Sequence, residues 1–287
     1  MKTRGRVVDR FPLTSFFLLS YVFFWLALGL FGLLVFGVFH ADLVSHPELQ
    51  YVVQIVGSWM PSVAMAIVVG MTSGRRSVVA QFRKLVAVPV AGRVVLVALV
   101  PVAVIFLAVA GYRLTGGAAS AGVALTGGFW ITWLILNIVT GATGEEPGWR
   151  GFALPILRER FRPVTAGLVL GVIWSWWHLP LWILSGHTGL DMLWYVIEFN
   201  VAIVSLSVLM VWLYLRAPHT LIPISLAHFG LNAALQLAGN SGLGLASDLP
   251  LLGWVAAGLL SATVILWVTA PTPVPDDAPD RALPIHA

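Results

Sequence analysis

The chain of 287 residues contains no cysteine, and only 10% of its residues are charged. The missing cysteines exclude disulfide bonds, thiolate nucleophiles and cysteine-based zinc or iron–sulfur sites. Soluble proteins carry about 25% charged residues, so this chain lacks the polar surface that would cover a soluble globule of its size. The composition therefore argues against a cytosolic enzyme, a secreted domain and a disordered protein.

Hydrophobic residues make up 59% of the chain, and the mean hydropathy is +0.93. They form apolar runs long enough to cross a hydrocarbon core of about 30 Å as helices, since lipid cannot satisfy backbone polar groups. The sequence predicts an all-α fold, a polytopic transmembrane helical bundle of about eight spans. The predicted spans are Leu13–Phe39, Tyr51–Met71, Val94–Gly111, Gly122–Glu146, Val164–Leu184, Met192–Leu215, Thr220–Ala238 and Leu249–Ala270.

The positions of the basic residues predict the orientation of the bundle. Except for Arg113, every Lys and Arg lies in the N-terminal arm, in the loops after spans two, four and six, or in the C-terminal tail. Cytoplasmic loops carry an excess of these residues, so both termini are predicted to be cytoplasmic. We expect a multi-pass protein of a bacterial plasma membrane, with the lipid bilayer as a partner. This asymmetry explains the pI of 9.9 without a nucleic-acid partner.

The spans and their flanks divide the chain into parts. The last part holds five prolines and three aspartates and is predicted to be disordered. The parts are a cytoplasmic arm (1–12), spans one to three with their loops (13–121), a core of spans four to seven (122–238), span eight (239–270) and the tail (271–287).

Polar groups inside a bilayer cost several kcal/mol and are candidate functional residues. Most of them here lie in the second half of the chain. They are Glu145, Glu146, Glu198, His178, His228, Asn137, Asn200 and Asn232. We interpret Glu198 and Asn200, which share span six, as a hydrogen-bonding pair of the bundle.

Three pairs are spaced by four residues, which places both members on one helical face. The pairs are Glu146 with Arg150, Trp174 with His178, and His228 with Asn232. Glu145 is rotated by about 100° from its neighbour, so we expect it to point into the bundle while Arg150 holds Glu146.

A carboxylate, two histidines and an amide in a wet pocket suit hydrolysis of a peptide bond without a covalent nucleophile. Glu145 would take a proton from water, and His178 would orient that water. His228 and Asn232 offer donors for the oxyanion that forms on the carbonyl. Simpler interpretations also exist, because a glutamate pair can cap a helix and a single membrane histidine is more often structural.

The three motifs together resemble a known family. Glu145 to Arg150 fit E-E-x-x-x-R, Trp174 to His178 fit an aromatic-x-x-x-H motif, and His228 to Asn232 fit H-x-x-x-[ND]. In this order on successive spans they resemble the CPBP intramembrane proteases, which include CAAX prenyl endopeptidases and bacteriocin-processing or immunity proteins.

The resemblance implies an endopeptidase in which Glu145 activates water with help from His178. It implies that His228 and Asn232 stabilise the oxyanion, and that Glu146 and Arg150 support the site, as does Trp174. The family is often described as metalloproteases, and Glu145 with the two histidines could bind zinc. We favour slightly a metal-free mechanism, which needs the same residues. The partner would be a peptide or protein substrate that enters from the membrane or the cytoplasm.

Two other functions remain open: a non-catalytic immunity or scaffold protein of the same fold, and a proton-coupled transporter. Transporters usually carry polar residues in both halves, unlike this chain.

The depths of the motifs constrain a shared site. His178 lies about 21 Å into span five, whereas Glu145 lies near the end of span four. For the residues to meet, span four must continue past Glu146 toward Arg150, or span five must begin before Val164 within a cytoplasmic vestibule. We therefore expect spans of uneven length and a site that opens to the cytoplasmic side.

Overall fold

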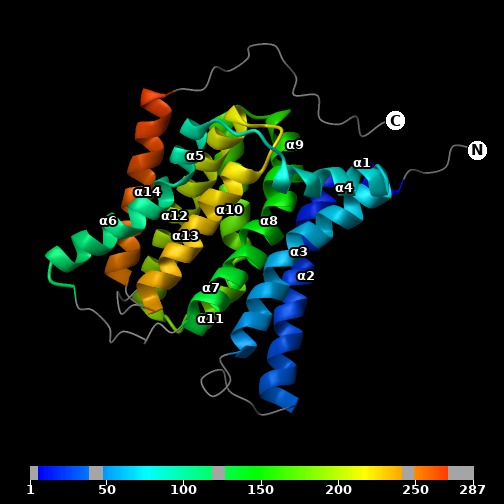
Figure 1. Ribbon diagram of the computed structural model, residues 1–287. Helices are drawn as coiled ribbons and strands as arrows, with labels where there is room; N and C mark the ends of the chain where they lie inside the picture. Colours follow the sequence, from blue (N-terminus) through cyan, green and yellow to red (C-terminus); the bar gives the residue numbers. More distant parts are fainter. Residues whose placement is uncertain (1–5, 39–47, 118–126, 241–248, 271–287) are drawn as a thin grey trace, which may run out of the picture.

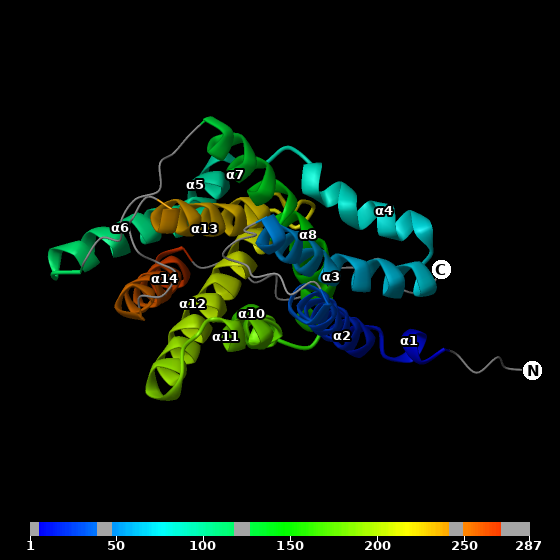
Figure 2. The same ribbon diagram turned by 90° about the horizontal axis from the view of Figure 1, so that it is seen from below.

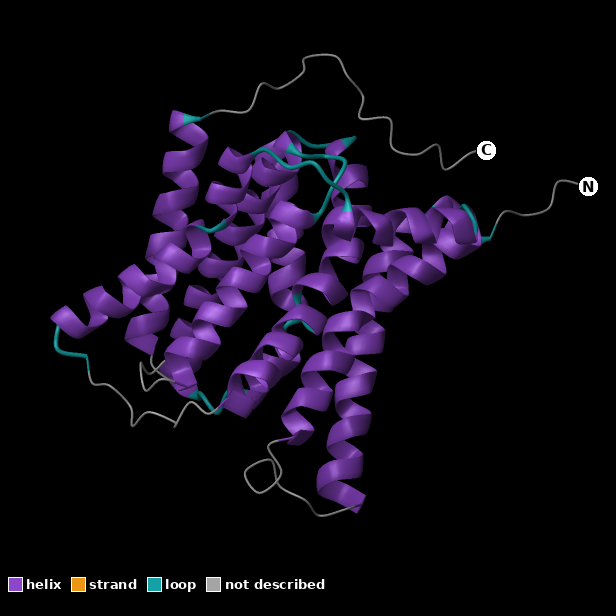
Figure 3. Ribbon diagram, viewed as in Figure 1, coloured by secondary structure: helices purple, strands orange, loops and turns teal. Residues whose placement is uncertain are grey.

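The structure, a computed structural model, describes residues 6–38, 48–117, 127–240 and 249–270. All regular secondary structure in these ranges is helical, with no strand among them, which confirms the all-α class (Figure 3). The predicted tail (271–287) lies outside the described residues.

The first half of the bundle begins with α1 in the N-terminal arm, and the motifs lie in the second half. The elements before the motifs are α1 (Val7–Arg10), α2 (Pro12–Gly32), the π-helix η1 (Leu33–Val38), α3 (Glu48–Thr72), α4 (Arg75–Arg83), the 3-10 helix η2 (Lys84–Val86), α5 (Gly92–Ala98) and α6 (Val100–Leu114). Those that follow are α7 (Gly127–Val139), α8 (Ala142–Gly148), the π-helix η3 (Trp149–Ala153), α9 (Leu154–Arg158), α10 (Pro163–Trp177), α11 (Leu179–Leu184), α12 (Gly189–Arg216), α13 (Ile222–Asn240) and α14 (Leu249–Thr269).

Among the described residues, five helices are long and apolar enough to cross a membrane. They are Pro12–Val38, Gln54–Thr72, Gly92–Leu114, Gly189–Arg216 and Leu249–Thr269. The segments that carry the motifs are shorter or divided: α10 has 15 residues, a length of about 22 Å, and α7 is separated from α8. Uneven span lengths are thus confirmed, while the total of eight spans and the cytoplasmic termini stay predictions.

Helix α12 lies against both α10 and α14 in the centre of the bundle (Figures 1 and 2). Small residues on α10 allow the close approach. A Cβ at Gly171 would lie 2.9 Å from the Val204 Cα, and one at Gly167 would lie 3.0 Å from the Val208 Cα. Glycine stripes of this kind let membrane helices pack backbone to backbone. This contact holds α10, and with it Trp174 and His178, in place.

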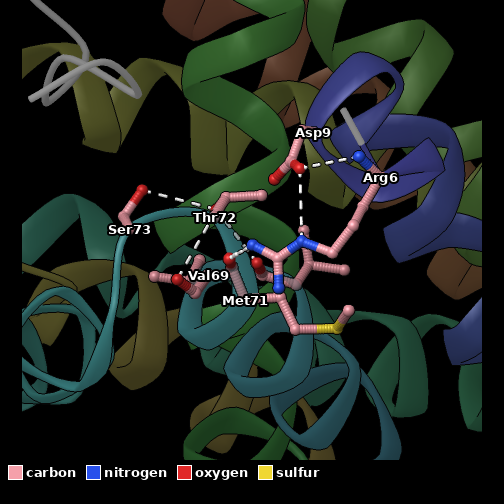
Figure 4. Close-up of polar contacts among 7 residues, drawn as sticks. Arg6, Asp9, Val69, Met71, Thr72 and Ser73 are labelled. Atoms are coloured by element: carbon pink, nitrogen blue, oxygen red, sulfur yellow. Dashed lines mark hydrogen bonds and ion pairs between the residues drawn. The ribbon is translucent and has the colours of Figure 1, made fainter. Parts of the chain in front are cut away.

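Helices α2 and α3 lie side by side at the other end of the bundle, and α3 also packs against α8 (Figures 1 and 2). The arm joins this pair through Arg6. Its backbone N–H and its Nε both donate to Asp9, and its guanidinium donates to the Met71 carbonyl near the end of α3 (Figure 4). A cation near a helix C-terminus is favourable, because the last carbonyls carry partial negative charge.

Candidate active site

The helix that carries the glutamate pair starts at a sharp break. Gly141 separates α7 from α8 with φ 54° and ψ −104°, and its carbonyl accepts the Glu145 N–H at 2.7 Å. The first turn of α8 then packs on the backbone of α3. A Cβ at Gly144 would lie 2.7 Å from the Ser58 carbonyl oxygen, and one at Gly148 would lie 2.6 Å from that of Pro61. Glycine at these positions therefore lets α8 approach α3 closely enough to fix both glutamates.

Glu146 is the centre of a buried charged cluster. Its Oε1 accepts Arg150 Nη1 at 3.1 Å and His228 Nδ1 at 2.6 Å. Glu146 and Arg150 have no exposed surface, and His228 is only 3% exposed. The predicted Glu146–Arg150 pair is therefore present, and it also holds a histidine from α13. Buried charges are costly unless they are paired in this way.

Glu145 faces a different partner, as its rotation around the helix predicts. The Trp174 indole Nε1 donates to Glu145 Oε2 at 2.7 Å. The same indole ring lies under the Arg150 guanidinium, with its centroid 4.1 Å from the guanidinium carbon. The backbone carbonyl of Trp174 accepts a hydrogen bond from His178 Nδ1 at 2.8 Å. Trp174 thus connects the glutamate pair of α8 to the histidine at the end of α10.

His178 occupies the junction between two helices. α10 ends at Trp177, and α11 begins at Leu179 with Pro180 in its first turn, where the missing proline N–H costs little. Because a carbonyl can only accept, the Nδ1 of His178 carries the hydrogen, and Nε2 is left as an acceptor in the neutral ring.

The polar atoms of α13 converge beside Gly141. A Cβ at Gly141 would lie 2.6 Å from Asn232 Nδ2 and 3.4 Å from His228 Nε2. These nitrogens are the donor atoms that we predicted for an oxyanion. The bare backbone of Gly141 therefore leaves the space in front of them clear.

A cavity of about 300 Å³ joins these groups; Glu145, His178 and Asn232 line it. Its other polar lining comes from Ser58 and Gln54 of α3, from Thr140, and from Gln236 of α13. Phe24 and Trp177, which stack with centroids 4.2 Å apart, form part of its apolar wall. The motif residues of α8, α10 and α13 are therefore brought to one place, as the spacing predicted.

The expected opening of the site near the cytoplasmic face stays a prediction, and the cavity lies away from the basic loops that we expect on that face. Glu145 lies 13 residues before Arg158, a rise of about 20 Å along α8 to α9, and the cavity lies on the far side of Glu145. Toward the basic end, Trp149 and Arg150 fill the interior with no exposed surface, and Phe16 packs on Trp149 with centroids 5.3 Å apart. The cavity reaches the surface instead at Gln54 and Leu181, in the half of the bundle away from the basic loops.

Glu198 and Asn200 take no part in this cavity. Asn200 donates to the Val196 carbonyl of its own helix at 2.7 Å, and it lines a separate apolar cavity between α10, α12 and α14. The Glu198 carboxylate faces Gly253 of α14, where a Cβ would lie 2.9 Å from its Oε1. The predicted pairing of these two residues with one another is therefore replaced by separate contacts.

Sequence reasoning did not single out Gly141, Gly144, Gln54 or Gln236. Gln236 follows Asn232 by four residues, as Asn232 follows His228, so the helical spacing that selected the first two would have found the third. Gly144 and Gly148 flank the glutamate pair four residues apart, a small-residue spacing typical of close helix packing. For Gln54, which lies in another span, the sequence holds no such signal.

The residues suggested as zinc ligands do not form a site as they lie. Among the described residues, no group of three or more His, Cys, Asp or Glu side chains is close enough to hold a metal ion. The Nδ1 atoms of His178 and His228 and the Oε2 atom of Glu145 have hydrogen-bond partners, so the two Nε2 atoms and Oε1 are the atoms that would face a metal ion. The metal-free mechanism stays a proposal.

Comparison with known proteins gives a family model and a curated relative. Residues 126–234 match the family model described as type II CAAX prenyl endopeptidase Rce1-like. CAAX prenyl protease 2 of Methanococcus maripaludis is 26% identical over 138 residues, which cover 47% of this chain and 49% of that protein. Both matches support the CPBP resemblance that the motifs indicate, and residues 126–234 form the CPBP-like core. The chain spans about half the length of the curated relative it matches.

The CPBP core contains every residue predicted for the site, from Glu145 to Asn232. Gln236 and the part of the cavity wall contributed by α2 and α3 lie outside the match.

Proposed function

We propose that this chain is an intramembrane endopeptidase that hydrolyses a peptide bond with a water molecule activated by Glu145. The observation that carries the proposal is the placement of Glu145 and Asn232 on the wall of one cavity, with His228 Nε2 beside Asn232 Nδ2. A base and a donor on one cavity, with a second donor beside them, are the elements that addition of water to a carbonyl requires.

In the first step, Glu145 takes a proton from water, and the hydroxide oxygen bonds to the carbonyl carbon of the substrate. Trp174 engages Glu145 Oε2, so Oε1 is the oxygen that faces the water. His178 Nε2 accepts the second hydrogen of the water and orients it, since Nδ1 is held by the Trp174 carbonyl.

The negative charge that develops on the carbonyl oxygen is stabilised by Asn232 Nδ2–H and by His228. His228 Nδ1 is held by Glu146 Oε1, so the ring would donate to the oxyanion from Nε2 in its doubly protonated form. In the second step the carbon–nitrogen bond breaks, and the protonated Glu145 gives its proton to the leaving amine. Atoms and charge balance, and no covalent enzyme intermediate forms.

The test is cleavage by purified protein in lipid nanodiscs. Quenched-fluorescent peptides of degenerate sequence serve as substrates, and mass spectrometry locates the cut. We expect the wild type to cleave, and Glu145→Gln or Asn232→Leu to lower kcat by about 100-fold or more, as losses at other base and oxyanion positions do. Equal cleavage by wild type and Glu145→Gln would overturn the proposal and favour the binding protein of the same fold.

A further inference from the structure

The cavity wall carries carboxamide side chains beyond those the proposed reaction uses. Gln236 lies one helical turn beyond Asn232 on α13, and Gln54 lies on α3 at the exposed edge of the cavity. Gln236 Oε1 accepts Asn137 Nδ2 at 2.7 Å, so a residue of α7 fixes the orientation of its side chain. A polar row, His228, Asn232 and Gln236, therefore runs along one face of α13 away from the basic end.

The spacing of this row matches an extended peptide. Four residues of helix advance about 6 Å, and two residues of extended chain advance about 6.6 Å. If the scissile carbonyl lies at Asn232, the main chain two residues away lies at Gln236. A carboxamide offers both a donor and an acceptor, which are the two kinds of group that a peptide main chain presents.

The location of the row also fits a binding role. On the Gln236 side of Glu145 a cavity remains that is lined by both polar and apolar side chains, whereas on the Arg150 side the interior is filled by buried side chains such as Trp149. A substrate held at Glu145 must therefore extend through the part of the cavity that Gln236 and Gln54 line.

On the basis of the proposed function, we propose that Gln236 binds the main chain of the substrate about two residues from the cleaved bond. Gln54 contacts the same segment from the opposite wall. Recognition through the main chain makes this part of the site tolerant of substrate sequence and dependent on substrate length.

The experiment compares Gln236→Leu with wild type on peptides that are shortened residue by residue from either end. The starting peptide is the best-cleaved member of the degenerate mixture. For the full-length peptide, we expect Gln236→Leu to raise KM about 3- to 10-fold with kcat within about twofold, the loss of one hydrogen bond. For peptides shortened to fewer than two residues on one side of the cut, the KM values of Gln236→Leu and wild type should differ by less than about twofold.

Asn200→Leu is the matched control, because it removes a carboxamide from a half-buried position on a neighbouring helix outside this cavity. It should leave KM unchanged for every peptide, and Gln236→Asn should recover part of the affinity. A KM increase that is the same at every length, a loss confined to kcat, or no increase at all would overturn the inference.

A second measurement separates this inference from the proposed function. The Glu145→Gln variant binds the same fluorescent peptides without turnover, so their Kd is read by anisotropy with and without Gln236→Leu. If cleavage depends on Glu145 but Gln236→Leu changes Kd equally for peptides of every length, only the proposed role of Gln236 is wrong. If the wild type binds the peptides but does not cleave them, the endopeptidase proposal is wrong, and only the binding of the peptide main chain by Gln236 remains.

Discussion

The indole N–H of Trp174 donates to Glu145 Oε2 at 2.7 Å, although the two residues are 29 positions apart in the chain. The contact crosses from α10 to α8 and leaves one oxygen of the carboxylate for the cavity. Its energetic value is high, because a hydrogen bond to a charged group contributes about 1.5–3 kcal/mol. We therefore regard Trp174 as the residue that positions the base.

Trp174→Phe keeps the aromatic ring and removes the donor. We expect kcat for peptide cleavage to fall by about 10- to 100-fold while the protein stays folded, since the Glu145 carboxylate loses its fixed orientation. Trp176→Phe is the control, because Trp176 is 48% exposed on the same helix. If both variants cleave at the wild-type rate, Trp174 contributes packing alone.

Glu146 and Glu145 are adjacent but should respond differently to substitution. Glu146→Ala leaves the buried Arg150 guanidinium without its anionic partner and removes the hydrogen bond to His228, which is expected to cost about 3–5 kcal/mol of stability. Glu145→Gln is nearly isosteric and should abolish cleavage with little effect on stability. Thermal unfolding in detergent, followed by circular dichroism, measures the first effect.

The control for that comparison is Glu159→Ala, since Glu159 is exposed at the end of α9. It should unfold at the wild-type temperature. An unfolding temperature of Glu146→Ala equal to that of Glu159→Ala would show that the buried cluster adds nothing to stability.

The sequence predicted which side chains meet but not where the cavity lies. Pairs four residues apart, such as His228 with Asn232, share a helical face in any helix, so their common direction follows from local geometry. The packing that closes the interior on the Arg150 side of Glu145 depends on Phe16 and Trp149. These two residues come from different helices and contact one another only in the folded bundle. The sequence alone does not indicate which neighbour a hydrophobic side chain of this kind will contact.

The break at Gly141 shows a second limit. Span four contains no proline or charged residue from Gly122 to Gly144, and such a run predicts one unbroken helix. The left-handed φ of 54° and the close approach of Asn232 arise from tertiary contacts with α3 and α13. The glycine stripe of α8 was a usable signal for the close packing, but not for the interruption.

Metal removal distinguishes the metal-free mechanism from a zinc-dependent one. Because Glu145, His178 and His228 do not gather into a three-ligand group, we expect cleavage to persist after treatment with a chelator and dialysis. Metal content by plasma mass spectrometry should stay well below one ion per chain. Loss of activity on chelation that zinc restores would require these side chains to move together, and it would replace the metal-free mechanism.

Gly141→Ala tests whether the space in front of the donors is needed for catalysis. The new methyl group would lie 2.6 Å from Asn232 Nδ2, so it must displace the amide that faces the oxyanion. Gly186→Ala is a matched control, because Gly186 has a φ of 82° and nothing within 4 Å of its added Cβ. Both variants place an alanine at a positive φ, which L side chains rarely adopt, so both carry backbone strain. We expect only Gly141→Ala to lower kcat, by about 100-fold, with KM less affected. A similar loss in both variants would assign the effect to backbone strain and leave Asn232 without support as an oxyanion donor.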